Sequence, residues 1–132
     1  MNGVDIIGQL LRGYAPLIAI WPAGSIKAGA LAEGQLGIVV RSISITDQQP
    51  LAWEPTVRST ERVSVTVRAQ TYRDQVATMK LIRRACTSVV ADAIGDARRI
   101  SVLTAGTGPD VNGPGNTFEQ AQDFRVSFDA PA

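Results

Sequence analysis

The chain has 132 residues, of which 45% are hydrophobic and 19% are charged. This size and composition are typical of one globular domain with its own core, and they exclude a wholly disordered chain. The 13 basic and 12 acidic residues leave a formal net charge of +1, which excludes a global field that attracts a polyanion such as DNA. We therefore expect a single domain over residues 1–132.

Neither a membrane segment nor a disulfide is expected. The N-terminus lacks a basic segment, and no apolar run approaches the ~20 residues that a membrane span needs. Cys86 is the only cysteine, so an intrachain disulfide is excluded. These features permit assembly inside a cell.

The first element is predicted as a helix over residues 3–13. Its apolar side chains recur at helical spacing, at Val4, Ile7, Leu11 and Tyr14. Asn2 suits the N-cap, and Asp5 lies where its carboxylate can accept a second free amide of the first turn. Gly13 and Pro16 should end the helix, since proline donates no backbone hydrogen bond.

Two loops and one strand are expected next. Residues 22–37 contain Pro22 and four glycines, which predicts an irregular surface segment. Residues 38–46 are rich in β-branched side chains and predict a half-buried strand. The stretch 47–62 has no clear period, so we interpret it as a long connection that forms an exposed hairpin arm.

The middle of the chain carries the clearest patterns. In residues 63–70, apolar side chains alternate with polar ones, as in a strand with one buried face. Thr71 and Asp74 form a pair that resembles a capping box and predicts the start of an amphipathic helix. The apolar stripe of this helix continues to Ala93, and Gly95 suits its C-cap.

The last part of the chain predicts two further strands. Residues 100–104 form the third strand, and residues 105–117, with four glycines and two prolines, form a long hairpin loop. A fourth strand is expected over 118–129, where apolar and polar side chains alternate. The order α-β-β-α-β-β predicts an α+β fold, in which a four-stranded, mainly antiparallel sheet carries both helices on one face.

Catalytic groups are scarce. The sequence contains no histidine, which removes the commonest general acid–base group and metal ligand. Cys86 falls on the apolar stripe of the second predicted helix, where a buried structural role is expected. The oxygen-bearing side chains of 105–117 lack the spacing of a calcium loop. We therefore predict no enzyme, no catalytic residue, no metal site and no cofactor.

The sequence gives more reason to expect binding to other proteins than catalysis. Most of the basic residues are arginines, whose forked geometry suits carboxylates at protein interfaces. Trp53, in the predicted connection, either packs back on its own sheet or anchors a partner. The candidate interface residues are Trp53, Glu54, Arg58, Arg62, Asp110 and Asn112. The candidate basic residues, on a lumen or on the outer surface, are Arg68, Arg83 and Arg84.

Four segments follow one another in a recognisable order. The N-terminal helix leads to residues 20–22, Ile-Trp-Pro, and then to 38–41, Ile-Val-Val-Arg. The valine-rich strand 62–72 runs directly into the long helix, and 123–128, Asp-Phe-Arg-Val-Ser-Phe, comes near the end. In order and spacing, the chain resembles the tail-terminator or tail-completion proteins of siphovirus-type phages, prophages and gene transfer agents.

The resemblance implies a structural virion protein of the tail or neck, assembled in the host cytoplasm. It implies a homo-oligomeric ring, typically a hexamer, that caps the tail tube protein, stops its polymerisation and joins the head-side connector or stopper protein. DNA would pass through the ring, and no membrane is involved. Under this hypothesis, loops 47–62 and 105–117 contact neighbouring subunits or the stacked tube.

Three alternatives remain open at this point. Another neck component, such as a head–tail joining or minor tail protein, has similar size and composition. A small cytosolic ligand-binding regulatory domain belongs to a different class and would need a small molecule at the glycine-rich loop. An enzyme would require a site built from arginines and carboxylates.

Overall fold

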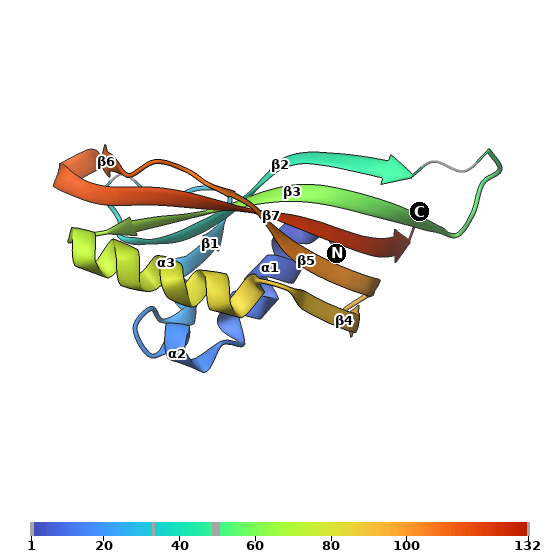
Figure 1. Ribbon diagram of the computed structural model, residues 1–132, viewed down its shortest axis with the longest axis horizontal. Helices are drawn as coiled ribbons and strands as arrows, with labels where there is room; N and C mark the ends of the chain where they lie inside the picture. The colour runs from blue at the N-terminus through green and yellow to red at the C-terminus, as the bar shows by residue number, and fades with distance from the viewer. Residues whose placement is uncertain (1, 33, 49–50, 132) are drawn as a thin grey trace.

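One twisted sheet organises the molecule (Figure 1). The computed structural model describes residues 2–32, 34–48 and 51–131. Seven strands take the order β1-β2-β3-β7-β5-β4, with β6 paired to β7, and only the β1–β2 pair is parallel within this described part. The strands are β1 (Ile26–Ala28), β2 (Gly37–Gln48), β3 (Thr56–Ala69), β4 (Val89–Ile94), β5 (Ala97–Thr107), β6 (Val111–Gly113) and β7 (Thr117–Pro131). The helices are α1 (Gly3–Arg12), α2 (Ala15–Ile18) and α3 (Tyr72–Cys86), with short 3₁₀ turns η1 (Ala23–Ser25) and η2 (Pro114–Asn116).

The central pair of the sheet is formed by β3 and β7. Their register is unbroken from Thr56 opposite Pro131 to Ala69 opposite Phe118. The two strands run almost the whole length of the molecule in Figure 1. β2 and β5 flank this pair, so both halves of the sheet are built on it.

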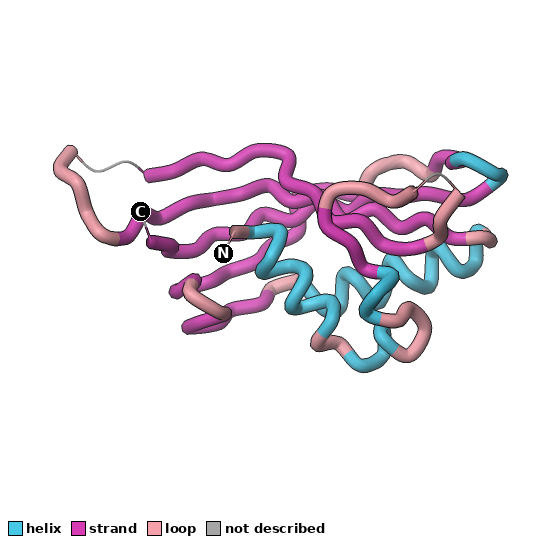
Figure 2. Tube along the Cα trace, turned by 180° about the vertical axis from the view of Figure 1, so that it is seen from behind, coloured by secondary structure: helices cyan, strands magenta, loops and turns pink. Residues whose placement is uncertain are grey.

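The core lies between one face of the sheet and the α-helices. Figure 2 shows α1, α2 and α3 along the same side of the sheet. On β3 the alternating residues Val63, Val65 and Val67 are fully buried, and on β7 Phe124 and Val126 are fully buried. Burying each such side chain contributes about 1.5–3 kcal/mol. We call this the core face and the opposite side the polar face.

Both predicted helix starts are confirmed. The Asn2 side chain accepts a hydrogen bond from the Asp5 amide at 3.0 Å, and the Asp5 carboxylate accepts one from the Asn2 amide at 3.1 Å. The Thr71 hydroxyl accepts a hydrogen bond from the Asp74 amide at 3.1 Å. These caps satisfy amides that have no partner within their own helix.

The predicted four-stranded α+β fold is wrong, because the structure is mostly β with seven strands. The largest error is the predicted helix up to Ala93, since α3 ends at Cys86 and residues 89–94 form strand β4. The chain leaves helical geometry at Thr87, whose backbone is extended with ψ 130°, and Ser88 follows with a positive φ of 55°. Gly95, expected as a C-cap, occupies the tight turn of the β4–β5 hairpin at φ 59°.

The three predicted loops are also too long. Segment 22–37 contains β1, which pairs with the start of β2. Segment 47–62 is mostly strand, because β2 reaches Gln48 and β3 begins at Thr56. Segment 105–117 contains the end of β5, all of β6 and the turn η2. Residues 49 and 50 of the hairpin arm lie outside the described residues.

Polar residues on the core face explain why the sequence did not predict the first half of β3, residues 56–62. Ser59 and Glu61 are only 6% and 1% exposed. Buried positions of a strand usually carry apolar side chains, so these two polar residues hide the alternation of the strand. Glu61 is accommodated because its carboxylate accepts a hydrogen bond of 3.0 Å from the Gly3 amide, at the N-terminus of α1. The positive end of the helix dipole favours a negative charge at this place.

No helix in the described parts of the chain has both the length and the apolar character that crossing a lipid bilayer demands.

Gly3 should be essential for the contact between α1 and β3. A Cβ atom at this position would lie 2.9 Å from both Glu61 Cδ and Val63 Cγ2, which are buried. Gly3→Ala is therefore expected to lower the free energy of unfolding by about 1–3 kcal/mol. Gly24→Ala is the control, because nothing lies within 4 Å of its Cβ position. Equal denaturant midpoints for the two variants would contradict the proposed close contact.

Candidate assembly surfaces

The hairpin between β2 and β3 forms an arm that extends beyond the rest of the molecule (Figure 1). At its tip Leu51 is fully exposed and Trp53 is 81% exposed, and Ile43 and Ile45 on β2 are 56% and 52% exposed. Trp53 therefore does not pack back on its own sheet. Glu54, beside it, is exposed as well. An exposed group of large apolar side chains is typical of a contact surface.

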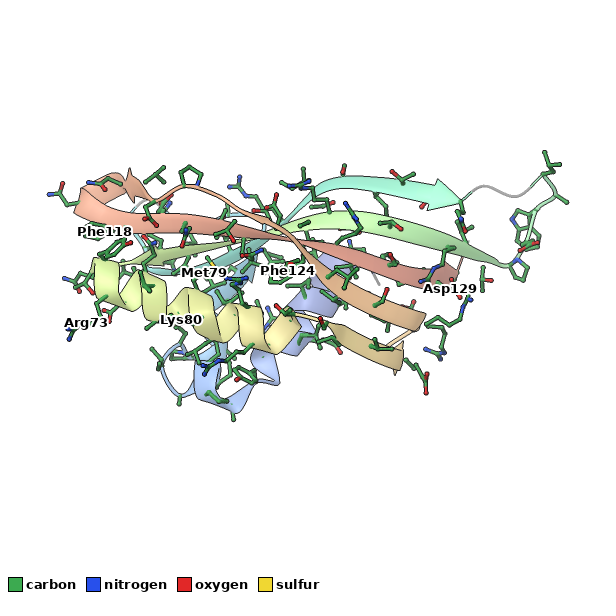
Figure 3. The ribbon with its side chains drawn as sticks, in the orientation of Figure 1. Arg73, Met79, Lys80, Phe118, Phe124 and Asp129 are labelled. Carbon is green, nitrogen blue, oxygen red and sulfur yellow. The ribbon has the colours of Figure 1, made fainter. Side chains whose placement is uncertain are left out.

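The polar face carries ion pairs between β3, β7 and β5. Arg62 Nε lies 2.8 Å from Asp123 Oδ2, and Arg68 Nε lies 2.5 Å from Glu119 Oε1. Asp129 binds two arginines, Arg58 at 3.3 Å and Arg99 at 2.5 Å, and Figure 3 shows it near the end of β7. Such cross-strand pairs stabilise the pairing of neighbouring strands.

Three of the candidate arginines are thus engaged within the chain. Arg58 also donates to the Arg99 carbonyl at 2.6 Å, and Arg62 donates to the Ala105 carbonyl at 2.9 Å. Arg68 donates to the carbonyl oxygens of Ala32 and Gln35, at 3.0 and 3.2 Å. A partner that binds any of these arginines must share or replace existing hydrogen bonds.

The glycine-rich segment 105–117 is held against its own sheet and α3. Asp110 accepts hydrogen bonds from the Tyr72 hydroxyl at 3.2 Å and from Gln75 Nε2 at 2.7 Å. The hydrogen bond from the Tyr72 hydroxyl to Asp110 and the negative charge of Asp110 raise the pKa of Tyr72. Asp110, predicted as an interface residue, is therefore also an internal anchor, whereas Asn112 on β6 is exposed.

The outer side of α3 carries free positive charge. Arg83 and Arg84, the other candidate basic residues, are exposed, as are Arg73 and Lys80 on the same helix (Figure 3). None of these four side chains forms an ion pair or hydrogen bond with another described residue. Lys80, Arg83 and Arg84 surround a shallow open hollow. We call these four residues the α3 basic stripe; it is available for a negatively charged partner.

The described residues give little support for covalent or metal chemistry. Cys86 is fully buried, and burial raises the pKa of its thiol to about 12, so it stays protonated at neutral pH. Among residues 2–32, 34–48 and 51–131, no three carboxylates or cysteines gather as a metal site requires.

Sequence reasoning missed two features of these surfaces. One of the two ion pairs of Asp129 is with Arg99, which lies between the predicted C-cap Gly95 and the predicted strand 100–104. Arg73 and Lys80 extend the basic surface beyond Arg83 and Arg84. Their spacing of seven residues along one helix was the available signal, since residues two turns apart share a face.

A solved structure has the same fold. The chain is similar to one in the virion of a native gene transfer agent particle, with a TM-score of 0.62 and 14% sequence identity. The alignment covers 98% of this chain and 100% of that chain. No protein-family model and no curated protein matches the sequence. At this level of identity, the similarity establishes the mostly β fold alone.

Asp129 should make the free energy of unfolding depend on pH in the acidic range. The hydrogen bond and charge of Arg99, with a contribution from Arg58, hold the pKa of Asp129 below its ordinary value of 3.8. Its stabilising effect is therefore complete above about pH 4 and is lost as the pH falls through the lowered pKa. Asp129→Asn should reduce the free energy of unfolding by on the order of 1 kcal/mol at pH 7 and flatten its acid dependence.

Denaturant unfolding at pH 7, 4 and 3 measures this effect. Asp92→Asn is the control, because Asp92 is exposed on β4 and binds no arginine in the described structure. If Asp129→Asn retained the acid dependence of the parent chain, the ion pairs would not be the cause.

Proposed function

We propose that this chain is a ring-forming tail terminator of a phage or phage-derived particle. Copies of the chain would form a ring that caps the finished tail tube and stops its polymerisation. The same ring would bind the head-side connector, and DNA would pass through it. This is a structural role without catalysis, performed in the virion.

The observation that carries this proposal is the fold shared with a chain of a gene transfer agent virion over nearly the full length of both. The alignment extends over 98% of this chain and 100% of the other, so the similarity is not limited to one part of the fold. The similarity supports a virion component in general. The terminator role in particular is supported by the order of segments in the sequence and by the surfaces described above.

The arm supports a role in assembly. Leu51 and Trp53 expose apolar area that costs free energy in water and is recovered when a partner covers it. The ion pairs of the polar face brace the base of the arm, since Arg58 at the start of β3 binds Asp129 at the end of β7. A braced arm loses less conformational freedom on binding.

The alternatives have less support. In a regulatory domain, the glycine-rich segment would bind a ligand, but here Gln120 Nε2 donates to the Gly108 carbonyl and Gln122 Nε2 donates to the Gly106 carbonyl, both at 3.0 Å. For an enzyme, the protonated thiol of Cys86 offers no nucleophile. Another neck protein could have the same fold, so only the position of the chain in the particle would distinguish it from a terminator.

The function is tested by removing the chain from its particle. A terminator stops tube growth, so particles assembled without it should have tails of uncontrolled length and should lack heads joined to tails. Electron microscopy measures both. Tails of normal length on headless particles would instead indicate a joining protein, and normal particles would overturn the proposal.

Removing the apolar tip should weaken assembly without unfolding the subunit. Leu51→Ala with Trp53→Ala is expected to reduce the fraction of chains in rings, or docked on tail tubes, by at least about tenfold, because buried tryptophans often act as hot spots. Arg58 is left intact because it binds Asp129. Light scattering and co-sedimentation with tubes measure the two fractions.

The control is Ile20→Ala, which removes another exposed large apolar side chain, 59% exposed, far along the chain from the arm. It should assemble normally. Unchanged assembly of the double variant, with an unchanged thermal midpoint, would exclude the arm tip as a contact.

A further inference from the structure

We propose that neighbouring subunits pair through their sheet edges, with β2 of one copy beside β4 of the next, so that the sheets continue from subunit to subunit. This inference rests on the proposed ring and identifies the surfaces that close it. The partner is a second copy of this chain.

Both edges are open. β1 covers β2 only at residues 38–40, so within the described residues no strand neighbours the backbone of 41–48 on that side. β4 is the last strand of the sheet and pairs with β5 alone. Figure 1 shows β2 and β4 as the two outer strands at the same wide end of the molecule. Unpaired strand edges are templates for pairing with another chain.

The usual protection of open edges is only partial in these two strands, which carry three charged residues between them, Arg41, Asp47 and Asp92. Soluble proteins often place lysine or proline on an edge strand to prevent pairing, and neither residue occurs in β2 or β4. β2 has one irregularity, between Ser42 and Ser44. Beyond it, residues 44–48 follow a continuous register with β3.

The two edges lie at the same level of the sheet. The registers of neighbouring strands place five residues in one row across the polar face: Thr46, Thr60, Ser127, Ser101 and Val90. The adjacent row on the core face consists of Ile45, Glu61, Val126, Val102 and Val89. The rows begin on β2 and end on β4, so copies placed side by side present matching rows.

The strand directions suit a ring. Two antiparallel pairs separate β2 from β7, and four separate β2 from β4, so β2, β7 and β4 run in the same direction. Rotation about an axis along the strands preserves that direction, so β2 meets the neighbouring β4 as a parallel pair. Because the two edges are different surfaces, the contact is heterologous and a rotation that closes produces a ring.

The side chains at the two edges are compatible. Val90 is 83% exposed on β4, and Ile45 is 52% exposed on β2. In the side-by-side arrangement, Ile45 continues the apolar row of Val89 and Val102 on the core face. Pairing would therefore bury apolar side chains as well as satisfy backbone hydrogen bonds.

Disulfide cross-linking tests the pairing. Thr46→Cys with Val90→Cys places one cysteine on each edge, in the same row of the polar face. Within one chain these positions are four strand spacings, roughly 19 Å, apart, which no disulfide spans. Ser44→Cys and Gln48→Cys, each combined with Val90→Cys, test registers shifted by two residues along β2.

Mild oxidation of the ring should convert at least one of these double variants into a ladder of covalent oligomers on non-reducing gels. Each single variant should remain mostly monomeric on the gel. The parent chain is the control, because its buried Cys86 should not react. Light scattering of each sample before oxidation establishes whether the ring is present.

The outcomes separate the two proposals. A ring that forms but gives no cross-link in any double variant would overturn the edge pairing and leave the terminator role intact. Covalent dimers from the Val90→Cys single variant would indicate antiparallel pairing of two β4 strands and would also overturn it. A monomer at every concentration, with or without tail tubes, would overturn both the ring and the edge pairing.

Discussion

The long antiparallel pair of β3 and β7 is the constraint on which the other features depend. Its register joins Thr56 to Pro131 and Ala69 to Phe118 without interruption, so the alternation of the two strands fixes one face for the core and the other for charged groups. A shift by one residue would place Val65 and Phe124 in water and the arginines in the core. The hairpins β2–β3 and β4–β5 are attached to this pair, and α1 and α3 cover its core face.

The polar face is charged, but its arginines are largely engaged. Arg58, Arg62 and Arg68 each bind a carboxylate on β7 and a backbone carbonyl oxygen on a neighbouring segment. These bonds fix the spacing of the strands along the β3–β7 pair, from Arg58 near the arm to Arg68 at the opposite end. The surfaces that remain for partners are therefore the arm tip, the strand edges and the α3 basic stripe. An inventory of arginines in the sequence cannot separate charges that hold the sheet together from charges that are free.

The sequence predicts an element well where one local rule acts alone. The alternation of residues 63–70 and the caps at Asn2 and Thr71 are local, and the structure confirms them. The start of β3 was missed because Glu61 is buried against the amide of Gly3, 58 residues away in sequence, and no periodicity reveals such a contact. β4 was missed because Val89 and Val90 continue a helical stripe, although the backbone leaves helical geometry at Thr87 and Ser88. For the candidate surfaces, the sequence located Trp53 in the arm but could not indicate that Asp110 anchors α3.

The geometry of edge pairing also assigns a direction to the arm. If strands run along the axis of the ring, as the side-by-side arrangement of β2 and β4 requires, then the β2–β3 hairpin projects from one rim rather than toward a neighbour in the same ring. Leu51 and Trp53 would then meet whatever is stacked on that rim, the tail tube or the connector. The edges would close the ring and the arm would join it to the next component, so one small domain would supply separate surfaces for the two contacts that a terminator needs. The α3 basic stripe lies on the helical side of the sheet, away from the arm, and its Arg83 and Arg84 lie in the last turn of α3, just before β4.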